Sequence, residues 1–291
     1  MSTAQHNGGG PIVRRMQLGA RLRHLREAKG LTREQAGWAI RGSESKISRM
    51  ELGRVGFKER DVTDLLLLYG VDDEREHERL LAVTREANAP GWWQPYNDLL
   101  PAWFQNYLGL EEAATYIRTY EVQFIPGLLQ TAAYARAVIM LGHGQADVSE
   151  LDRRVELRMT RTRLLARPGA PRLWAVLDEA VLRRPIGGKA VLRAQLVSLL
   201  EQCDNPNIQL QVVPFLSGGH AAAGGAFTLL RFPLQDLPDT VYLEQLTSAI
   251  YLDKREDVDR YAAAATKLFI EADPPDRTPA ILRDVIRDLD R

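Results

Sequence analysis

The sequence predicts a multidomain chain: an all-α N-terminal helix-turn-helix domain, followed by an α+β domain with a mostly antiparallel sheet and flanking helices. Apolar residues repeat at helical spacing over residues 14–88, whereas the alternation typical of strands begins after Pro171. Charge is also divided, because residues 14–60 hold 13 Lys and Arg against 5 Asp and Glu, and the remainder holds 25 against 33. A basic first fifth and an acidic remainder indicate a nucleic-acid-binding end attached to another module.

We divide the chain into four parts by these changes in composition. Residues 1–13 are polar and Gly-rich and are expected to form a disordered tail. Residues 14–88 form the helical domain, and residues 89–272 form a helical connector plus the α+β domain. Residues 273–291 are a Pro-rich spacer with a C-terminal amphipathic helix, which must bury its apolar stripe on its own domain or on a partner subunit.

The first predicted helix, Met16–Lys29, has an apolar stripe at positions i, i+4 and i+7. Leu18, Leu22 and Leu25 form this stripe, and Arg26 is placed off it. Two later helices of the domain are predicted over Lys58–Tyr69 and Asp73–Asn88.

Between the first helix and these two later helices, residues 31–53 are predicted to form two short helices joined by a tight turn. Thr32 and Gln35 suit a capping box that begins a helix over Arg33–Ile40. Ser43 suits the N-cap of a second helix, Glu44–Leu52, which Gly53 ends. A small residue is needed where the two helices cross, and Gly37 stands there. The apolar residues expected to meet between the helices are Ala36, Ile40, Ile47 and Met50.

The outer face of the second helix is predicted to be polar, with side chains that reach base edges or phosphates in the major groove. A plain surface hairpin is the alternative interpretation. Arg54, Lys58 and Arg60 follow the helix and are placed to contact phosphates. The residues of this face are Glu44, Ser45, Lys46, Ser48 and Arg49.

The segments TREQAGWAI (Thr32–Ile40) and SESKISRMELG (Ser43–Gly53) resemble the Xre (phage repressor-like) helix-turn-helix family, most specifically in the ending ISRMELG. Two positions depart from the family pattern. Arg41 stands where the turn glycine is usual, which costs about 1 kcal/mol if it is left-handed. Trp38 stands where a charged surface residue is usual, so it is either buried under its own loops or contacts another domain or subunit.

The resemblance implies operator binding through a defined set of side chains. Ser45, Lys46 and Arg49 are expected to contact bases, with Arg49 suited to guanine. Arg33 and Gln35 are expected to hold phosphate at the first turn of the preceding helix. The full predicted DNA-binding set is Arg33, Gln35, Ser43, Glu44, Ser45, Lys46, Ser48, Arg49, Arg54 and Lys58.

Beyond residue 88 the pattern alternates between helix and strand. Ala89–Leu100 contains adjacent Trp92 and Trp93 and reads as a connector packed against a neighbour, with a plain interdomain core and a pocket lining as alternatives. The last three strands have short connections and are expected to form antiparallel hairpins. The predicted helices are 110–120, 126–141, 149–166, 178–183, 188–203, 256–269 and 280–290; residues 122–125 are extended, and the strands are Arg172–Leu177, Ile208–Val213, Phe227–Phe232, Thr240–Glu244 and Ala249–Leu252.

Residues 90–270 are similar to an uncharacterised, antitoxin-like C-terminal domain attached to Xre-type regulators of actinomycete bacteria. The resemblance implies regulation by contact with a small partner protein encoded next to the regulator. The segments that carry it are YEVQFIPGLLQTAAYARAVI (Tyr120–Ile139), VLDEAVLRRPIGG (Val176–Gly188), NIQLQVVPF (Asn207–Phe215), GGAFTLLRF (Gly224–Phe232) and TVYLEQLTSAIYL (Thr240–Leu252).

No catalytic, cofactor or metal motif is present in the sequence. The five histidines lack metal-ligand spacing, and the single cysteine, Cys203, allows no intramolecular disulfide, which points to a reducing compartment. Asp178 and Glu179 are adjacent carboxylates whose side chains diverge or favour a helix start, and the glycines of 218–225 read as a hairpin loop. We therefore expect no enzyme, no cofactor and no metal.

These observations predict a sequence-specific DNA-binding transcriptional regulator. The resemblance to both families further implies that it binds double-stranded DNA as a homodimer, with a C-terminal domain that dimerises and receives a signal from a small neighbour-encoded protein. Two alternatives stay open: a small-molecule sensor with a pocket near the strands and the 92–107 aromatics, and an antitoxin-like protein-interaction module. No secretory signal or apolar run of membrane-spanning length is found, so we expect a cytoplasmic protein without membrane contact.

Overall fold

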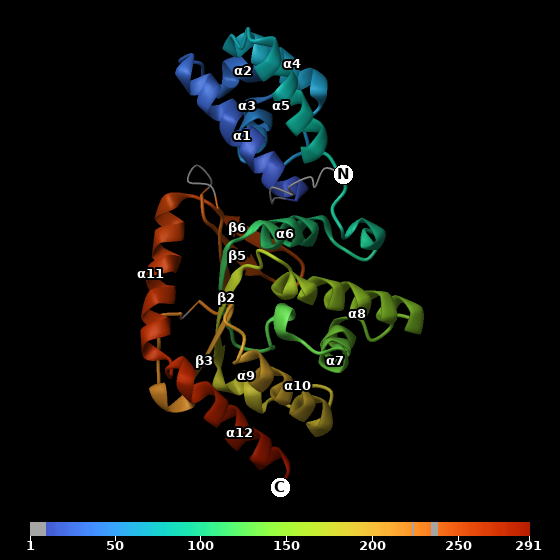
Figure 1. The fold of residues 1–291 in the computed structure, drawn as a ribbon, viewed down its shortest axis with the longest axis vertical. Coiled ribbons are helices and arrows are strands. Elements are labelled where there is room, and N and C mark those ends of the chain that lie inside the picture. The colour runs from blue at the N-terminus through green and yellow to red at the C-terminus, as the bar shows by residue number, and fades with distance from the viewer. Residues whose placement is uncertain (1–9, 223, 234–237) are drawn as a thin grey trace, which may run out of the picture. The chain divides into compact units, whose positions relative to one another are not determined.

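The structure is a computed structural model that describes residues 10–222, 224–233 and 238–291 (Figure 1). These residues divide into two compact units. The helical unit comprises residues 10–95 and 104–113, and the sheet unit comprises residues 96–103, 114–233 and 238–291. Each unit is described by itself below.

The prediction of a disordered tail over residues 1–13 is wrong for residues 11–13. Residues 1–9 lie outside the described residues, but helix α1 already begins at Pro11, where proline suits the first helical turn. Ile12 and Val13 are buried. Ile12 packs against α6 (Ala102–Ala113), where a Cβ added to Gly109 would lie 2.0 Å from Ile12 Cγ1. Residues 11–13 are therefore part of the helical unit.

The helical unit contains the five predicted helices α1 to α5, with boundaries that differ from the prediction by at most five residues. Asp73 caps α5 through its side chain, and Gly70 ends α4 in a left-handed conformation. The core is apolar and includes Leu18, Leu22 and Leu65. The helices are α1 (Pro11–Ala28), α2 (Arg33–Ala39), α3 (Glu44–Glu51), α4 (Glu59–Tyr69), α5 (Glu74–Ala87), the 3-10 helix η1 (Gln94–Tyr96) and α6 (Ala102–Ala113).

The stripe predicted on the first helix needs one correction. Leu18 and Leu22 are buried as expected, but Arg26 is also buried, at 6% exposed, whereas Leu25 is only partly buried. Arg26 lies four residues after Leu22, so it continues the same helical face. A buried guanidinium on an apolar face requires an anionic partner.

A mixed sheet forms the centre of the sheet unit. Strands β3, β2 and β1 are parallel, whereas β1, β4, β5 and β6 pair antiparallel in succession. The predicted antiparallel hairpins are confirmed. The prediction of a mostly antiparallel sheet is roughly correct, because three of the five described strand pairs are antiparallel and two are parallel. The described strands are β1 (Tyr116–Glu121), β2 (Arg172–Asp178), β3 (Ile208–Val213), β4 (Phe227–Arg231), β5 (Thr240–Glu244) and β6 (Ala249–Leu252), in the order β3-β2-β1-β4-β5-β6.

The prediction of a helix over residues 110–120 is wrong, because α6 ends at Ala113 and residues 116–120 lie in strand β1. Apart from Arg118, residues 116–120 are aromatic or β-branched, which favours a strand. The strand hydrogen-bonds to β2 on one side and to β4 on the other. Two ladders outweigh the weak helical propensity of this segment.

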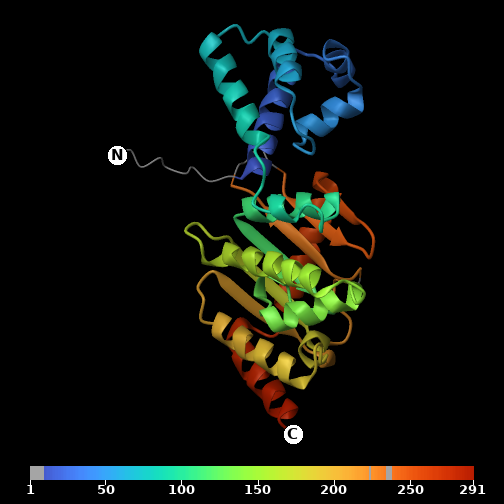
Figure 2. The ribbon, with the colours of Figure 1, turned by 90° about the vertical axis from the view of Figure 1, so that its right-hand side faces the viewer.

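Helices cover both faces of the sheet (Figures 1 and 2). Helix α11 crosses one face, and α7, α8, α9 and α10 lie over the other. The described helices are η2 (Gly127–Leu129), α7 (Ala132–Gly142), α8 (Val148–Thr162), η3 (Arg163–Ala166), α9 (Glu179–Arg183), α10 (Lys189–Gln202), η4 (Phe215–Ser217), α11 (Arg255–Glu271), η5 (Pro275–Arg277) and α12 (Thr278–Leu289).

The single helix predicted from Pro126 is broken at Gln130–Thr131. Thr131 caps α7, and the fully buried Gln195 of α10 holds the break from the other side. Its Oε1 accepts from Thr131 N at 2.7 Å, and its Nε2 donates to Leu129 O at 2.8 Å. One buried amide thus satisfies two backbone groups that a continuous helix would have paired internally.

The C-terminal amphipathic helix buries its stripe within its own unit. Leu282 and Val285 of α12 are buried, and α12 packs against α10. Thr278 Oγ1 donates to Leu210 O of β3 at 2.7 Å. Among the described residues, no helix has the length and apolarity needed to cross a membrane, and no cluster of His, Cys, Asp and Glu suits a metal ion.

Glu121 ends β1 with a carboxyl group in an unfavourable electrostatic position. Burial and, to a smaller extent, the nearby Glu244 raise its pKa and outweigh the lowering effect of Arg161 and Arg158, so that the pKa rises from the ordinary 4.5 to about 8. Between pH 4.5 and about pH 8, the Glu121 carboxyl of the folded protein holds a proton that the unfolded chain has lost. This group therefore contributes nothing below pH 4.5, and its destabilisation grows as the pH rises to about 8.

We predict that Glu121→Gln removes this pH dependence, because the amide cannot ionise. The variant should melt at the wild-type temperature near pH 5 and above it at about pH 8.5. Thermal unfolding at both pH values measures the difference. Glu201→Gln on α10, an exposed position, is the matched control and should follow the wild type. A variant with the wild-type pH profile would contradict the assignment.

Candidate nucleic-acid interface

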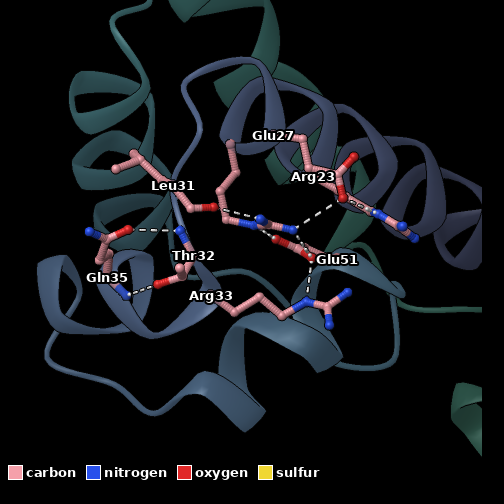
Figure 3. Close-up of polar contacts among 8 residues, drawn as sticks. Arg23, Glu27, Leu31, Thr32, Arg33, Gln35 and Glu51 are labelled. Atoms are coloured by element: carbon pink, nitrogen blue, oxygen red, sulfur yellow. Dashed lines mark hydrogen bonds and ion pairs between the residues drawn. The ribbon is translucent and has the colours of Figure 1, made fainter.

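The two short helices are capped as the sequence predicts. Gln35 N donates to Thr32 Oγ1 at 3.2 Å, and Thr32 N donates to Gln35 Oε1 at 2.8 Å, which completes the capping box (Figure 3). Ser43 Oγ accepts from Lys46 N at 3.2 Å and so caps α3. Gly53 is left-handed, with φ +65°, and follows the end of α3. Local sequence therefore determines where both helices begin and where α3 ends.

The turn between them has the strain that the sequence suggested. Arg41 has φ +50° and is the only left-handed residue other than glycine among the described residues. Gly42 is not left-handed, but a Cβ there would lie 2.9 Å from Lys46 Cδ. At Gly37 a Cβ would lie 3.0 Å from the carbonyl carbon of Ser43, so a small residue is needed at this crossing. Trp38 is 78% exposed within the structure.

A buried carboxylate joins the first three helices. Glu51 of α3, whose side chain is 2% exposed, accepts from Arg26 Nη2 of α1 at 3.1 Å and from Arg33 Nε of α2 at 2.9 Å. Arg26 Nη1 also donates to Leu31 O at 2.7 Å, and the hydrogen bond with Glu51 raises the pKa of Arg26. Charge-assisted, bidentate contacts of this kind hold geometry closely. We name Arg26, Arg33 and Glu51 the buried triad.

Arg33, which was predicted to hold phosphate, therefore also forms an internal ion pair with Glu51. Its Nε faces Glu51, and its side chain is 34% exposed. In Figure 3 its two terminal nitrogens point away from Glu51. Those nitrogens remain the part of Arg33 that can reach an anion outside the protein.

The outer face of α3 is less uniformly exposed than predicted. Glu44, Ser45 and Arg49 are exposed, and Arg49 Nε donates to Ser45 O at 3.3 Å. Ser48 is partly buried. Lys46 is also partly buried, because its Nζ lies 2.6 Å from Asp61 Oδ2 of α4. The prediction that all five side chains are exposed is wrong for these two positions.

Asp61 and Glu51 are functional-site residues that the sequence interpretation missed. Asp61 lies four residues before Leu65, and Glu51 lies four residues after Ile47. Each carboxylate therefore continues an apolar face of its helix, and both are buried. A carboxylate on such a face requires a cation, and that pattern is the sequence signal for both pairs.

The cations around α3 divide into those paired with buried carboxylates and those exposed to solvent. Arg26, Arg33 and Lys46 form ion pairs with buried carboxylates, which neutralise much of their charge inside the domain. Arg60 lies 4.0 Å from Asp64. Ser43 and Gln35 use their side-chain oxygens as caps. The exposed cations along this segment are Arg41, Arg49, Arg54, Lys58 and Arg60.

We predict that Glu51→Gln destabilises the helical unit by about 3 kcal/mol, because Arg26 keeps its charge without a buried anion. In the full chain, amide hydrogen exchange of α1–α3 should accelerate on the order of 100-fold. Glu78→Gln, an exposed position on α5, should change exchange less than about twofold. Equal effects of the two substitutions would contradict a structural role for the buried triad.

We also predict that Arg41→Gly stabilises the turn by about 1 kcal/mol relative to Arg41→Ala. Both variants remove the same charge, but only glycine relieves the positive φ. Denaturant titration followed by hydrogen exchange in α2 and α3 compares them. Identical stabilities would show that the backbone at residue 41 carries no strain.

Comparison with known families agrees with this geometry. A family model described as a helix-turn-helix domain matches residues 17–80, which include α2, the turn and α3. A second model, described as a domain of unknown function (DUF5753), matches residues 104–284. No curated protein and no solved structure showed a match to the chain. Because the second model covers more than half of the sequence, the chain belongs to the DUF5753 family and carries a helix-turn-helix domain at its N-terminal end.

Proposed function

We propose that the protein is a sequence-specific transcriptional regulator of the Xre type that reads duplex DNA with α3. The observation that carries the proposal is the outer face of α3, where Glu44, Ser45 and Arg49 are exposed on a helix held from beneath by the buried triad. A recognition helix needs this combination of a fixed inner side and a donor-bearing outer side.

The side chains divide into base contacts and phosphate contacts. Arg49 has the planar fork that suits guanine, and Ser45 lies one turn before it on the same face. Lys46 and Ser48 reach DNA only from the edge of this face, because both are partly buried. Arg54 and Lys58 follow α3 and suit phosphates, as do the outer nitrogens of Arg33. Gln35 and Ser43 lie at the helix starts, where backbone amides attract phosphate. The carboxylate of Glu44 repels phosphate and instead suits the amino group of cytosine.

The proposal assigns the remaining domain a regulatory role. The sheet unit dimerises and receives a signal through contact with a small partner protein, in the manner of antitoxin-like regulators. Two copies of α3 then contact two half-sites about one helical turn of DNA apart. This activity in the cytoplasm needs no catalytic step, cofactor or metal.

We predict that Arg49→Ala and Lys58→Ala weaken DNA binding in different ways. Duplexes selected from a random library by the wild-type chain serve as specific DNA. Arg49→Ala should cost about 1–3 kcal/mol on the selected duplex and relax one base position. Lys58→Ala should weaken specific and random DNA alike and reduce the salt slope by about 0.9.

Arg255→Ala is the control, since Arg255 is a 95% exposed arginine side chain of the sheet unit. Its affinity and salt slope should match the wild type. If Arg49→Ala lost equal affinity for selected and random duplexes, Arg49 would not read a base. If the wild-type chain selected no duplex at all, the proposed function would be wrong.

A further inference from the structure

Three arginines of the sheet unit lie together on one face of the sheet. The register pairs Tyr116 of β1 with Arg172 of β2 and with Arg231 of β4. Arg118 lies two residues after Tyr116, so its side chain projects to the same face. Neighbouring strands are about 4.8 Å apart, which keeps the three side chains within reach of one small molecule. We name Arg118, Arg172 and Arg231 the arginine face.

Arg118 lies beside a stacked pair of aromatic rings, Trp174 and Phe269, which we name the aromatic platform. Its Cζ lies 5.5 Å from the Trp174 ring centroid and 5.8 Å from that of Phe269. The two rings stack with centroids 4.0 Å apart and planes inclined by 9°. Cation–π contact orients a guanidinium without using its N–H donors, so those donors stay available.

The platform is itself fixed by hydrogen bonds. Trp174 Nε1 donates to Gln211 Oε1 at 2.5 Å. Gln211 Nε2 donates to Phe269 O and to Asp273 O, both at 3.1 Å, and Gln211 is buried. These contacts join β2, β3 and the end of α11 beneath Arg118. The guanidinium is therefore preorganised rather than a mobile surface charge.

The arginine face carries more positive charge than its carboxylates neutralise. Arg231 pairs with Asp239, with Nη2 2.9 Å from Oδ2. Within the described ranges, no carboxylate forms an ion pair with Arg118 or Arg172. Arg172 instead lies over the Tyr116 ring, with Cζ 5.9 Å from the centroid. Burial lowers the pKa of Arg118 and the charge of Arg231 lowers it further, whereas Asp239, the ion-pair partner of Arg231, raises it. A partly desolvated cation beside a like charge is unfavourable unless an anion joins it.

We propose that the arginine face binds the oxyanion of a small phosphate-bearing molecule, with Arg118 as its central ligand. Arginine forks match phosphate oxygens in bidentate geometry. A dianionic phosphoryl group also matches the two cations that lack carboxylate partners, which a single carboxylate does not. The face spans three strands rather than a row of charges, so it suits a compact ligand better than a nucleic-acid backbone. This site does not depend on DNA reading by α3.

Inorganic phosphate is the probe for this site. Isothermal titration of the full chain with phosphate, against sodium chloride at equal ionic strength, should show phosphate-specific binding. Arg118→Met, which keeps the apolar stem over Trp174, should raise the Kd at least about tenfold. Arg172→Met should raise it by a smaller factor, about threefold. Arg255→Met, an exposed cation of the same unit, should leave it unchanged.

Two further measurements keep the outcome decisive. If Arg118→Met does not fold, Arg118→Lys retains the charge without the fork and should still weaken phosphate binding. Phosphorus NMR line broadening by the wild-type chain measures binding without any variant. Absence of phosphate-specific binding, or equal binding by Arg118→Met, would overturn the proposal. Displacement of phosphate by duplex DNA in the Arg49→Ala chain would also overturn it, because the site would then hold a nucleic-acid backbone.

Discussion

The helical unit depends on one buried carboxylate. Glu51 lies at the end of α3 and binds Arg26 of α1 and Arg33 of α2, so three helices meet at a single charge. Such an arrangement is favourable only when every charge in it is paired, because an isolated buried ion costs several kcal/mol. Gly37 allows α2 and α3 to cross closely, and the contacts of Glu51 hold α3 against α1 and α2.

Buried carboxylates also decide which cations remain outside. Asp61 draws Lys46 inward, and Glu51 draws Arg26 fully and Arg33 partly inward. The number of basic residues in the N-terminal segment is therefore larger than the number of cations exposed to a polyanion. Arg49, which has no carboxylate pair among the described residues, stays on the outer face. The composition of the candidate interface is set by pairing inside the domain as much as by the residues of α3.

In the sheet unit, charged side chains lie near both ends of the central strand β1. Glu121 lies at the C-terminal end of β1, where burial favours its protonated form. Arg118 and Tyr116 lie nearer the start of β1, beside arginines of β2 and β4. A central strand has neighbours on both sides, so polar residues there gather partners from several elements. The arginine face and the Glu121 environment are both consequences of the position of β1 in the sheet.

The sequence alone determined the features that depend on neighbours in the chain. Caps at Thr32 and Ser43, the left-handed Gly53 and the antiparallel hairpins of β4–β6 all arise within a few residues, and each was predicted. Tertiary structure decided β1, the parallel pairing of β1–β3, the break held by Gln195 and the partners of Glu51 and Lys46. These joined segments are distant in sequence, and local propensity is too weak to choose between such pairings.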